Sequence, residues 1–327
     1  MVNLKYRDAI RITIEEELRR DKDLILIGEE IRDGYQGCFG VTKGMCEEFD
    51  PDRIIDTPIS EASIIGAAMG ASMLGLKTIA EIMFEDFITV CFDGIVNQAA
   101  KLKIISGDQF SLNMVIRTPG GSGGLGIQHS QCLESIFMHF PGLYIAVPSN
   151  AYDAKGLLKT AINYGNPVLF FEHKRLYNME SEVPEEDYRI EFGKANLIKE
   201  GKDLTIVAFS YMANVSKDAV IKVEKEYDVS IELIDPRTLV PIDYALIIES
   251  VKKTGRLMIV EEGVLRAGVG SEIAAEIQEN CFDFLDSPVK RIASKNYLIP
   301  ITPVMAESIV PDSELVQKEI RSILSLK

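Results

Sequence analysis

Residues 56–71 read DTPISEASIIGAAMGA, and this stretch is the one around which the fold of the chain can be worked out. Ser60 or Thr57 can cap a helix whose first turn holds Glu61, where a carboxylate gains from the helix dipole. Small residues then recur four apart from Gly66 onward, leaving a helix face on which another backbone can pack closely. We expect Glu61 to lie near an interface. Ordinary helix capping, or interface burial without a catalytic role, are the alternatives.

Helical and strand-like patterns alternate on both sides of this stretch. Such alternation is typical of an α/β fold, here a doubly wound domain with a largely parallel sheet, and we place this first domain at residues 1–180. Apolar residues at helical spacing over 6–21 precede a short aliphatic run at 24–27. The further strands expected are 77–82, 113–117, 143–147 and 167–172, and the further helices are 62–74, 86–105, 130–140 and 151–164.

The periodicity fails between Arg175 and Asp187, where an acidic segment broken by Pro184 predicts a linker. A second, smaller doubly wound α/β domain is expected over residues 190–327. Its expected strands are 204–209, 230–234, 256–260 and 289–293, and its helices are 213–226, 244–253, 271–280 and one from Ser313. A chain of 327 residues, 46% of them hydrophobic, is long enough to bury two such cores.

Composition excludes several classes of protein. Five cysteines are scattered without a C-x-x-C pair, so neither a zinc site nor a disulfide framework is indicated. A net charge of -15 repels phosphate backbones and anionic lipid surfaces, which argues against nucleic-acid or membrane binding. No apolar run approaches the ~20 residues of a membrane span, and the first residues lack the apolar core of a signal peptide. We therefore expect an unexported, cytoplasmic protein.

Ordered motifs along nearly the whole chain resemble the β subunits of the pyruvate, branched-chain 2-oxo acid and acetoin dehydrogenases, which belong to the transketolase-like group. The motifs that carry the resemblance are DTPISEA (56–62), GAAMGA (66–71), AEIMFEDF (80–87), GIQHSQ (126–131), FPGL (140–143), PSNAYDAKGL (148–157), FEHK (171–174), DPRTLVP (235–241), VEEG (260–263) and GVGSEIA (268–274). The resemblance implies an N-terminal domain that binds the pyrimidine of thiamin diphosphate and a transketolase C-terminal-like domain.

The resemblance also implies roles for single residues. Glu61 matches the glutamate that contacts the N1′ nitrogen of the thiamin aminopyrimidine, where a shared proton promotes removal of the proton at thiazolium C2. Phe87 matches an aromatic residue that lies against the pyrimidine ring, and Met83 matches a nearby apolar contact. For Phe87 and Met83, packing in a hydrophobic core is the alternative, and for Met83 it has equal weight.

His129 follows a glycine-rich run at 120–126 and begins an expected helix. The run lacks the Lys-Ser/Thr ending of a P-loop, so by itself it does not indicate a phosphate site. By resemblance, His129 faces the reactive end of the cofactor, where it can assist proton transfer or acyl transfer to lipoamide. We assign His139 and His173 structural roles, since three separated histidines do not suggest a catalytic zinc site.

The loop at 161–166 resembles one that holds a potassium ion through main-chain carbonyls in some relatives. The carbonyls concerned are those of Met114, Ala161, Ile162, Tyr164 and Asn166. Tyr164 replaces an acidic residue sometimes found there. An ordinary helix C-terminal turn accounts for this segment equally well.

A missing motif indicates a partner. The diphosphate of the cofactor binds through a divalent cation, commonly held by a G-D-G motif and a later Asn, whereas residues 106–109 read SGDQ without the second glycine. We infer that an α subunit supplies magnesium and the diphosphate half of the site. The resemblance implies an α2β2 heterotetramer that works with a lipoyl E2 acyltransferase.

The activity implied is decarboxylation of a 2-oxo acid, most simply pyruvate, or cleavage of acetoin, followed by acyl transfer to lipoyl-E2. The segments 149–156 and 172–177 favour the pyruvate and acetoin enzymes over the branched-chain E1 β subunit, which remains an alternative. A split transketolase that transfers a ketol unit is another. The non-enzymatic alternative is a scaffold or regulatory protein whose site is inactive. Residues 296–303 depart from the family pattern, which leaves the E2-docking surface open.

Overall fold

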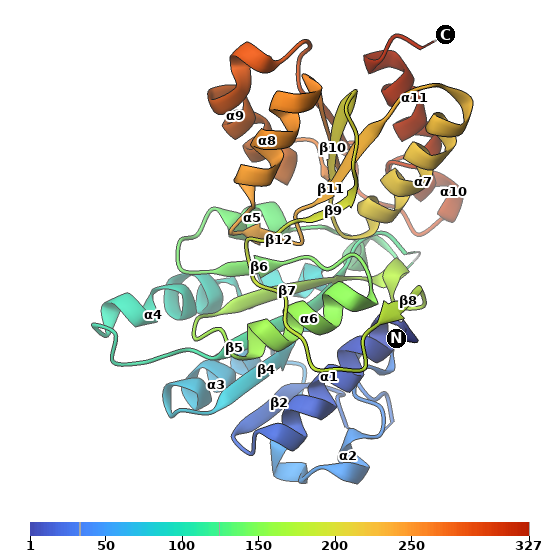
Figure 1. The fold of residues 1–327 in the computed structure, drawn as a ribbon. Coiled ribbons are helices and arrows are strands. Elements are labelled where there is room, and N and C mark those ends of the chain that lie inside the picture. The colour runs from blue at the N-terminus through green and yellow to red at the C-terminus, as the bar shows by residue number, and fades with distance from the viewer. Residues whose placement is uncertain (33, 124, 327) are drawn as a thin grey trace. The chain divides into compact units, whose positions relative to one another are not determined.

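The structure, a computed structural model, describes residues 1–32, 34–123 and 125–326. By its contacts the chain divides into two units, one made of Met1–Gly120 and Ile136–Phe192 and the other of Gly121–Ser135 and Gly193–Lys327 (Figure 1). The domains expected from the sequence are continuous, whereas the segment 121–135 makes its contacts within the second unit.

The first unit is built around a parallel sheet whose strands run in the order β6-β7-β5-β4-β2-β3. These strands are β2 (Leu24–Glu29), β3 (Ile54–Thr57), β4 (Lys77–Glu81), β5 (Met114–Gly120), β6 (Tyr144–Ala146) and β7 (Val168–His173). The helices of this unit are α1 (Tyr6–Arg20), α2 (Met45–Glu48), α3 (Glu61–Met73), α4 (Ala100–Ile105) and α6 (Ala151–Ile162). Every residue of β5 and β7 is buried, as expected for a parallel sheet covered on both faces.

The strand order reverses at β2, which lies between β3 and β4. In open α/β sheets, ligands bind beyond the carboxyl ends of the strands at such a reversal. Here those ends are Glu29, Thr57 and Glu81. The edge of the sheet at these residues is therefore where a site is expected.

The prediction of one continuous α-helix at 86–105 is wrong. The segment forms a 3-10 turn, η3 (Glu85–Thr89), a π turn, η4 (Gly94–Ala99), and then α4. A Cβ at Gly94 would lie 3.1 Å from the Ile65 side chain on α3, a tight approach that favours glycine at this position. The helix expected at 130–140 is also shorter, since α5 covers Glu134–Met138.

The segment expected to be a linker, 175–187, packs on the first unit instead. β8 (Glu180–Val183) pairs antiparallel with β1 (Val2–Lys5), and Val183 is buried. Asp187 forms ion pairs with Lys159 and Arg20. The chain leaves this unit at Phe192. The sequence pattern did not show this because both contacts are with residues far away in the chain.

The second unit has a sheet in the order β14-β13-β10-β11-β9, in which the edge strand β9 alone is antiparallel to its neighbour. The strands of this sheet are β9 (Asn196–Lys199), β10 (Leu204–Ala208), β11 (Ile231–Asp235), β13 (Leu257–Val264) and β14 (Lys290–Ser294). The unit also contains a short strand outside this sheet, β12 (Thr238–Val240). Its helices are α7 (Tyr211–Glu226), α8 (Tyr244–Thr254), α9 (Val269–Cys281), α10 (Pro303–Glu307) and α11 (Ser313–Ile323). α7 packs against α11 over a core that includes Ile206, Leu233 and Met258.

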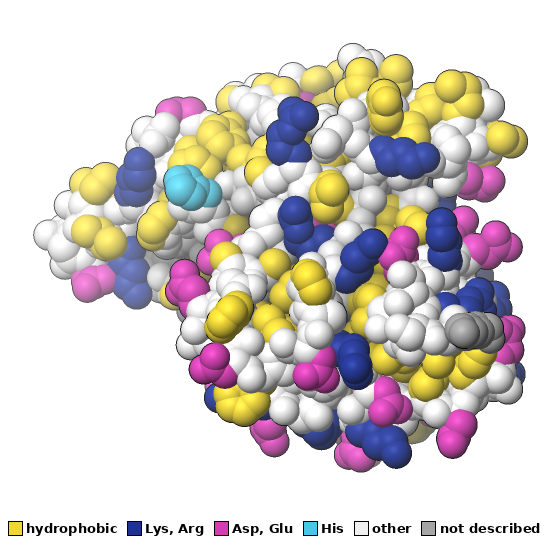
Figure 2. All heavy atoms as spheres, turned by 90° about the horizontal axis from the view of Figure 1, so that it is seen from above, with side chains coloured by type: hydrophobic (Ala, Val, Ile, Leu, Met, Phe, Trp, Pro, Cys, Tyr) yellow, Lys and Arg dark blue, Asp and Glu magenta, His cyan; other side chains and the backbone are white. Residues whose placement is uncertain are grey.

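The surface carries both signs of charge. On the face shown in Figure 2, basic and acidic side chains are interspersed with apolar ones. Among the helices of the described residues, none is long and apolar enough to cross a membrane. The two α/β units expected from the alternating pattern are therefore present, and most expected strands and helices agree with the structure to within a few residues.

Candidate active site

Glu61 is the first residue of α3, four residues beyond the end of β3. Ser60 occupies the N-cap position, but its side chain makes no capping hydrogen bond and its hydroxyl donates instead to Ser63 Oγ at 2.8 Å. Thr57 Oγ1 is buried without a hydrogen-bond partner among the residues that the structure describes. The expected side-chain cap is thus absent, and the helix amides at this end leave Glu61 as the acidic group in the positive field of the dipole.

The Glu61 side chain is only 8% exposed. Within residues 1–32, 34–123 and 125–326, no donor hydrogen-bonds its carboxylate, and its oxygens are not sealed from solvent. A carboxylate that is open to solvent on one side and unpaired within the protein can accept a hydrogen bond from a ligand. Glu61 therefore fits a site for a ligand that presents an N–H group or a basic ring nitrogen.

Acidic groups, Glu61 among them, act on Glu29 at the carboxyl end of β2. Burial raises the pKa of Glu29, and the charges of Glu61, Glu30 and Asp56 raise it further. Asp56 Oδ1 accepts the Ile31 N–H at 2.8 Å, so it anchors the chain after β2. Sequence reasoning missed Glu29. Its position at the end of an aliphatic run was the available signal.

Phe87 and Met83 follow β4 in the same unit. Both side chains are half-buried, which leaves part of a ring and part of a thioether available to a ligand. The Phe87 ring meets Phe84 edge to face, with ring centroids 5.8 Å apart. Cys91 continues this segment, and burial together with the charge of Glu61 raises the pKa of its thiol to about 12. Cys91, four residues beyond Phe87 on this segment, thus lies near Glu61.

His129 lies in the second unit, on the short 3-10 turn η5 (Ile127–His129), rather than at the start of a long helix. Gly126 has φ +100°, which favours glycine, and its carbonyl accepts both the His129 N–H at 3.2 Å and the Ser130 hydroxyl at 2.8 Å. The imidazole is half-buried. Gly124, in the glycine-rich run, lies outside the described residues.

Three acidic residues of the second unit, Glu134, Glu261 and Glu262, lie near one another, and Glu262 contacts the start of the segment 121–135 that carries His129. Glu262 Oε1 accepts the Ser122 N–H at 2.5 Å, and Glu261 Oε1 accepts the Gly270 N–H at 3.0 Å. Burial raises the pKa of Glu134 to about 7, with contributions from Glu261 and Glu262. Burial likewise raises the pKa of Glu261 to about 7. The motif VEEG drew attention to two of these residues, but only the fold brings Glu134 to them.

A buried ion network at the carboxyl edge of the first sheet was also missed. Arg117 on β5 donates to Glu81 Oε2 at 2.8 Å and to both oxygens of Glu172 on β7 at 2.7 and 3.0 Å. Each of the three residues is at most 2% exposed. Charged residues inside otherwise aliphatic strands were the signal in the sequence.

The loop at 161–166 has the geometry of an ordinary helix C-terminal turn. The Tyr164 N–H donates to the Ala161 carbonyl at 3.2 Å. The Tyr164 ring packs on Phe192, with centroids 4.8 Å apart, and on Tyr144 at 4.5 Å. No group of three His, Cys, Asp or Glu side chains in the described part of the chain is arranged to hold a metal ion. The carbonyl site for potassium stays a prediction.

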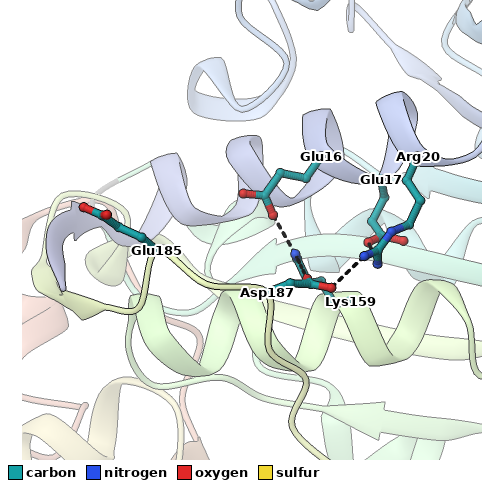
Figure 3. Close-up of a pocket in the computed structure, with 6 residues that line it drawn as sticks. All are labelled: Glu16, Glu17, Arg20, Lys159, Glu185 and Asp187. Atoms are coloured by element: carbon teal, nitrogen blue, oxygen red, sulfur yellow. Dashed lines mark hydrogen bonds and ion pairs between the residues drawn. The ribbon is translucent and has the colours of Figure 1, made fainter.

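A polar pocket of about 220 Å³ lies between α1 and α6, away from the carboxyl edge of the sheet (Figure 3). Lys159 extends from α6 between Glu16 on α1 and Asp187, and Arg20 reaches the same aspartate. Hydrogen bonds from Lys159 and Arg20 lower the pKa of Asp187 to about 2. Glu16, Glu17, Arg20, Lys159 and Asp187 thus pair with one another, and these ion pairs join α1, α6 and the chain after β8.

Two family models match the chain, "Transketolase, pyrimidine binding domain" over residues 2–180 and "Transketolase, C-terminal domain" over residues 193–316. The chain is 41% identical to the acetoin:2,6-dichlorophenolindophenol oxidoreductase subunit β of Bacillus subtilis, over 94% of this chain and 93% of that one. It is 40% identical to the pyruvate dehydrogenase E1 component subunit β of Rickettsia felis, over 98% of each.

A third relative, the 2-oxoisovalerate dehydrogenase subunit β of Bacillus subtilis, is 39% identical over 98% of each chain. Among solved structures, one described as a split gene transketolase, inactive β4 tetramer, matches with a TM-score of 0.80 over 99% of each chain. At 23% identity this match concerns the fold alone.

Proposed function

This chain belongs to the transketolase-like family that contains the β subunits of acetoin, pyruvate and 2-oxoisovalerate dehydrogenases, and on that premise we propose that it is the β subunit of a thiamin-diphosphate-dependent E1 enzyme. The observation that carries the proposal is the Glu61 carboxylate. It heads α3, is largely buried, and has no hydrogen-bond donor in the part of the chain described. Phe87 and Met83, both half-buried, belong to the segment beside it.

When bound, thiamin diphosphate supplies the carbon nucleophile that attacks the substrate's oxo group and accepts the electrons of the bond that breaks. Glu61 holds a proton shared with ring nitrogen N1′ of the pyrimidine, and the low local dielectric strengthens this interaction. Phe87 provides a flat apolar surface for the pyrimidine ring, and Met83 an adaptable apolar contact. His129 moves a proton at the substrate oxygen and assists acyl transfer to a lipoyl group.

The chain works, in this proposal, with an α subunit that holds magnesium and the diphosphate. Support comes from residues 106–109, which lack the second glycine of a G-D-G motif, and from the names of the relatives, which are β subunits. The proposed assembly is a cytoplasmic α2β2 heterotetramer that delivers the acyl group to a lipoyl-E2 acyltransferase. A potassium ion on the carbonyls at 161–166 and Met114 is part of the proposal, and exchange of K⁺ for Na⁺ should then lower the Tm of the complex.

The acyl group is proposed to come from pyruvate or acetoin. Identities of 39–41% to acetoin, pyruvate and 2-oxoisovalerate relatives do not separate these substrates, so the preference rests on the segments 149–156 and 172–177. Steady-state kinetics of the reconstituted complex with pyruvate, acetoin and 2-oxoisovalerate would rank them by kcat/KM.

The test of the function is a Glu61→Gln variant in the complex reconstituted with α subunit, E2 and the NAD-linked E3. We expect lipoamide-dependent NADH formation to fall by about 10² or more, because proton transfer at a positioned side chain contributes on that order. Glu47→Gln, at an exposed position of the same unit, is the control and should leave turnover unchanged. Normal turnover by Glu61→Gln would refute the proposal. Ketol transfer without E2 would identify a split transketolase instead.

A further inference from the structure

The connection between β2 and β3 contains a strained stretch that the proposed mechanism does not use. Phe39 has φ +59° and ψ 24°, the left-handed region that a bulky side chain rarely adopts. Gly37 and Gly40, on either side, have φ of +73° and +76°. Such strain persists only where the surroundings determine the backbone strongly, and it concentrates at functional sites. The contacts of residues 37–40 therefore indicate which function the strained backbone conformation supports.

The backbone of this stretch is fixed by the buried ion network. The Cys38 N–H donates to Glu81 Oε1 at 2.7 Å, while Glu81 Oε2 accepts from Arg117 at 2.8 Å. Arg117 grips both oxygens of Glu172, and the Tyr177 hydroxyl donates to Glu172 Oε2 at 2.6 Å. One end of the strained loop is thus tied to three neighbouring strands, β4, β5 and β7.

The charges within this buried network act on one another's pKa values. Burial raises the pKa of Glu81, while the charge of Arg117 acts in the opposite direction. Burial would lower the pKa of Arg117, but the charges of Glu172 and Glu81 outweigh it and raise that pKa. Removing one charged member would leave its partner buried and unpaired, which is costly, so the network keeps Glu81 in place. Glu81 in turn fixes the backbone at Cys38 by accepting its N–H.

The ring of Phe39 contacts the segment that follows β4. It packs on Tyr177, with centroids 4.9 Å apart, and meets Phe84 edge to face at 6.3 Å. Phe84 in turn meets Phe87 edge to face at 5.8 Å. The Cys38 thiol donates to the Met83 carbonyl at 3.1 Å. Both proposed pyrimidine contacts are therefore linked to residues 38 and 39 by ring packing or a hydrogen bond.

We propose that Phe39 is a positioning residue for the cofactor: held in a left-handed conformation by the Glu81–Arg117–Glu172 network, it sets the orientation of Phe84 and so of the Phe87 ring that receives the pyrimidine. This inference deepens the proposed function and rests on it. Phe39 itself does not touch the cofactor. Its loss acts through the angle at which Phe87 presents its face, because ring pairs depend on their mutual orientation.

The test measures the affinity of the αβ complex for thiamin diphosphate in the presence of magnesium, by isothermal titration, together with the Tm. Phe39→Leu removes the ring but keeps apolar bulk, and we expect the Kd for thiamin diphosphate to rise about fivefold, the scale of one aromatic contact. Phe39→Tyr keeps the ring and should restore the Kd to within about twofold of the parent. Phe39→Met, which fills irregular space without a ring, serves if Phe39→Leu does not fold.

Phe140→Leu is the matched control. Phe140 is also half-buried and also meets two rings, but these are Phe92 at 5.4 Å and His139 at 5.7 Å rather than Phe84 or Phe87. It should lower the Tm by a similar amount and leave the Kd unchanged. If the parent complex binds thiamin diphosphate and neither Phe39→Leu nor Phe39→Met weakens it, or if Phe140→Leu weakens it equally, the inference is overturned. If the parent complex does not bind thiamin diphosphate, the proposed function itself fails.

Discussion

Two glutamates of the second unit titrate near neutral pH because they are buried. The pKa values of Glu134 and Glu261 are both raised to about 7, and for Glu134 the neighbouring carboxylates contribute. An unfolded glutamate titrates near 4.3. Between about pH 4.3 and pH 7 the folded chain therefore holds protons that the unfolded chain has released. The contribution of these two glutamates to the free energy of unfolding is therefore expected to fall as the pH rises through this window and to level off above it.

Glu134→Gln should remove part of that slope. Since glutamine does not titrate, the variant should lose less stability between pH 5 and pH 8 than the parent chain, by up to about 3 kcal/mol. Urea unfolding at several pH values measures this difference, with the exposed Glu47→Gln as control. Parallel pH curves for parent and Glu134→Gln would contradict the assignment.

Gly142 allows a second test at the scale of single residues, which measures the steric cost of adding a side chain. It has φ +96°, and a Cβ there would lie 2.1 Å from the Ala100 carbonyl oxygen, a backbone atom that cannot turn away. Gly75 has φ +97° with nothing near a Cβ position, so it carries the conformational cost alone. We expect Gly75→Ala to cost about 1–2 kcal/mol and Gly142→Ala clearly more, measured by urea unfolding. Equal costs would mean that the contact relaxes.

At the scale of elements, α3 is packed on one side only within its unit. Ile64, Ile65 and Ala68 are buried, while Gly66 has no atom within 4 Å of a Cβ position and neither has Gly70. The open side consists of small residues, as the sequence pattern predicted. It remains a prediction that another backbone packs there.

Gly66→Ala combined with Gly70→Ala tests that prediction. In the lone chain we expect stabilisation of up to about 1 kcal/mol per site, because alanine favours the helix and nothing collides with it. In the complex the added methyl groups should weaken association with the α subunit. Thermal unfolding of the lone chain and titration with the α subunit measure the two effects. Unchanged association would show that no backbone approaches this face.

At the scale of the whole molecule, the chain passes between its two units three times. The segment 121–135 belongs to the second unit but is flanked on both sides by the first. Glu262 Oε1 holds the Ser122 N–H within the second unit. A cut between the family-model regions 2–180 and 193–316 would therefore leave part of the second unit on the N-terminal fragment.

A specific protease site inserted after the exposed Lys194 tests this arrangement. We expect the nicked chain to elute as one species in gel filtration and to separate in urea, because segment 121–135 stays bound in the second unit. Glu262→Ala should make the nicked fragments separate at a lower urea concentration. Separate elution of the two fragments under native conditions would contradict the division into units.

Local patterns predicted most of the regular structure because they depend on near neighbours. The strands at 24–27 and 204–209 and the helix at 151–164 agree with β2, β10 and α6 to within a few residues. The helix expected at 86–105 is interrupted at Gly94, which lies close to Ile65, a contact that no local pattern encodes. Short β1 and β8 also escaped notice, since each is ordered by the other.

By itself the sequence determined two α/β units, the family, and the placement of Glu61 at the head of a helix with one face of small residues. Only the tertiary structure decided that Glu29 lies near that carboxylate, that Arg117 joins two buried glutamates, and that Phe39 is held left-handed against Phe84. The reason is the range of the forces. Periodicity and capping act over one or two turns, whereas buried charges and ring contacts require the strand order that brings distant residues together.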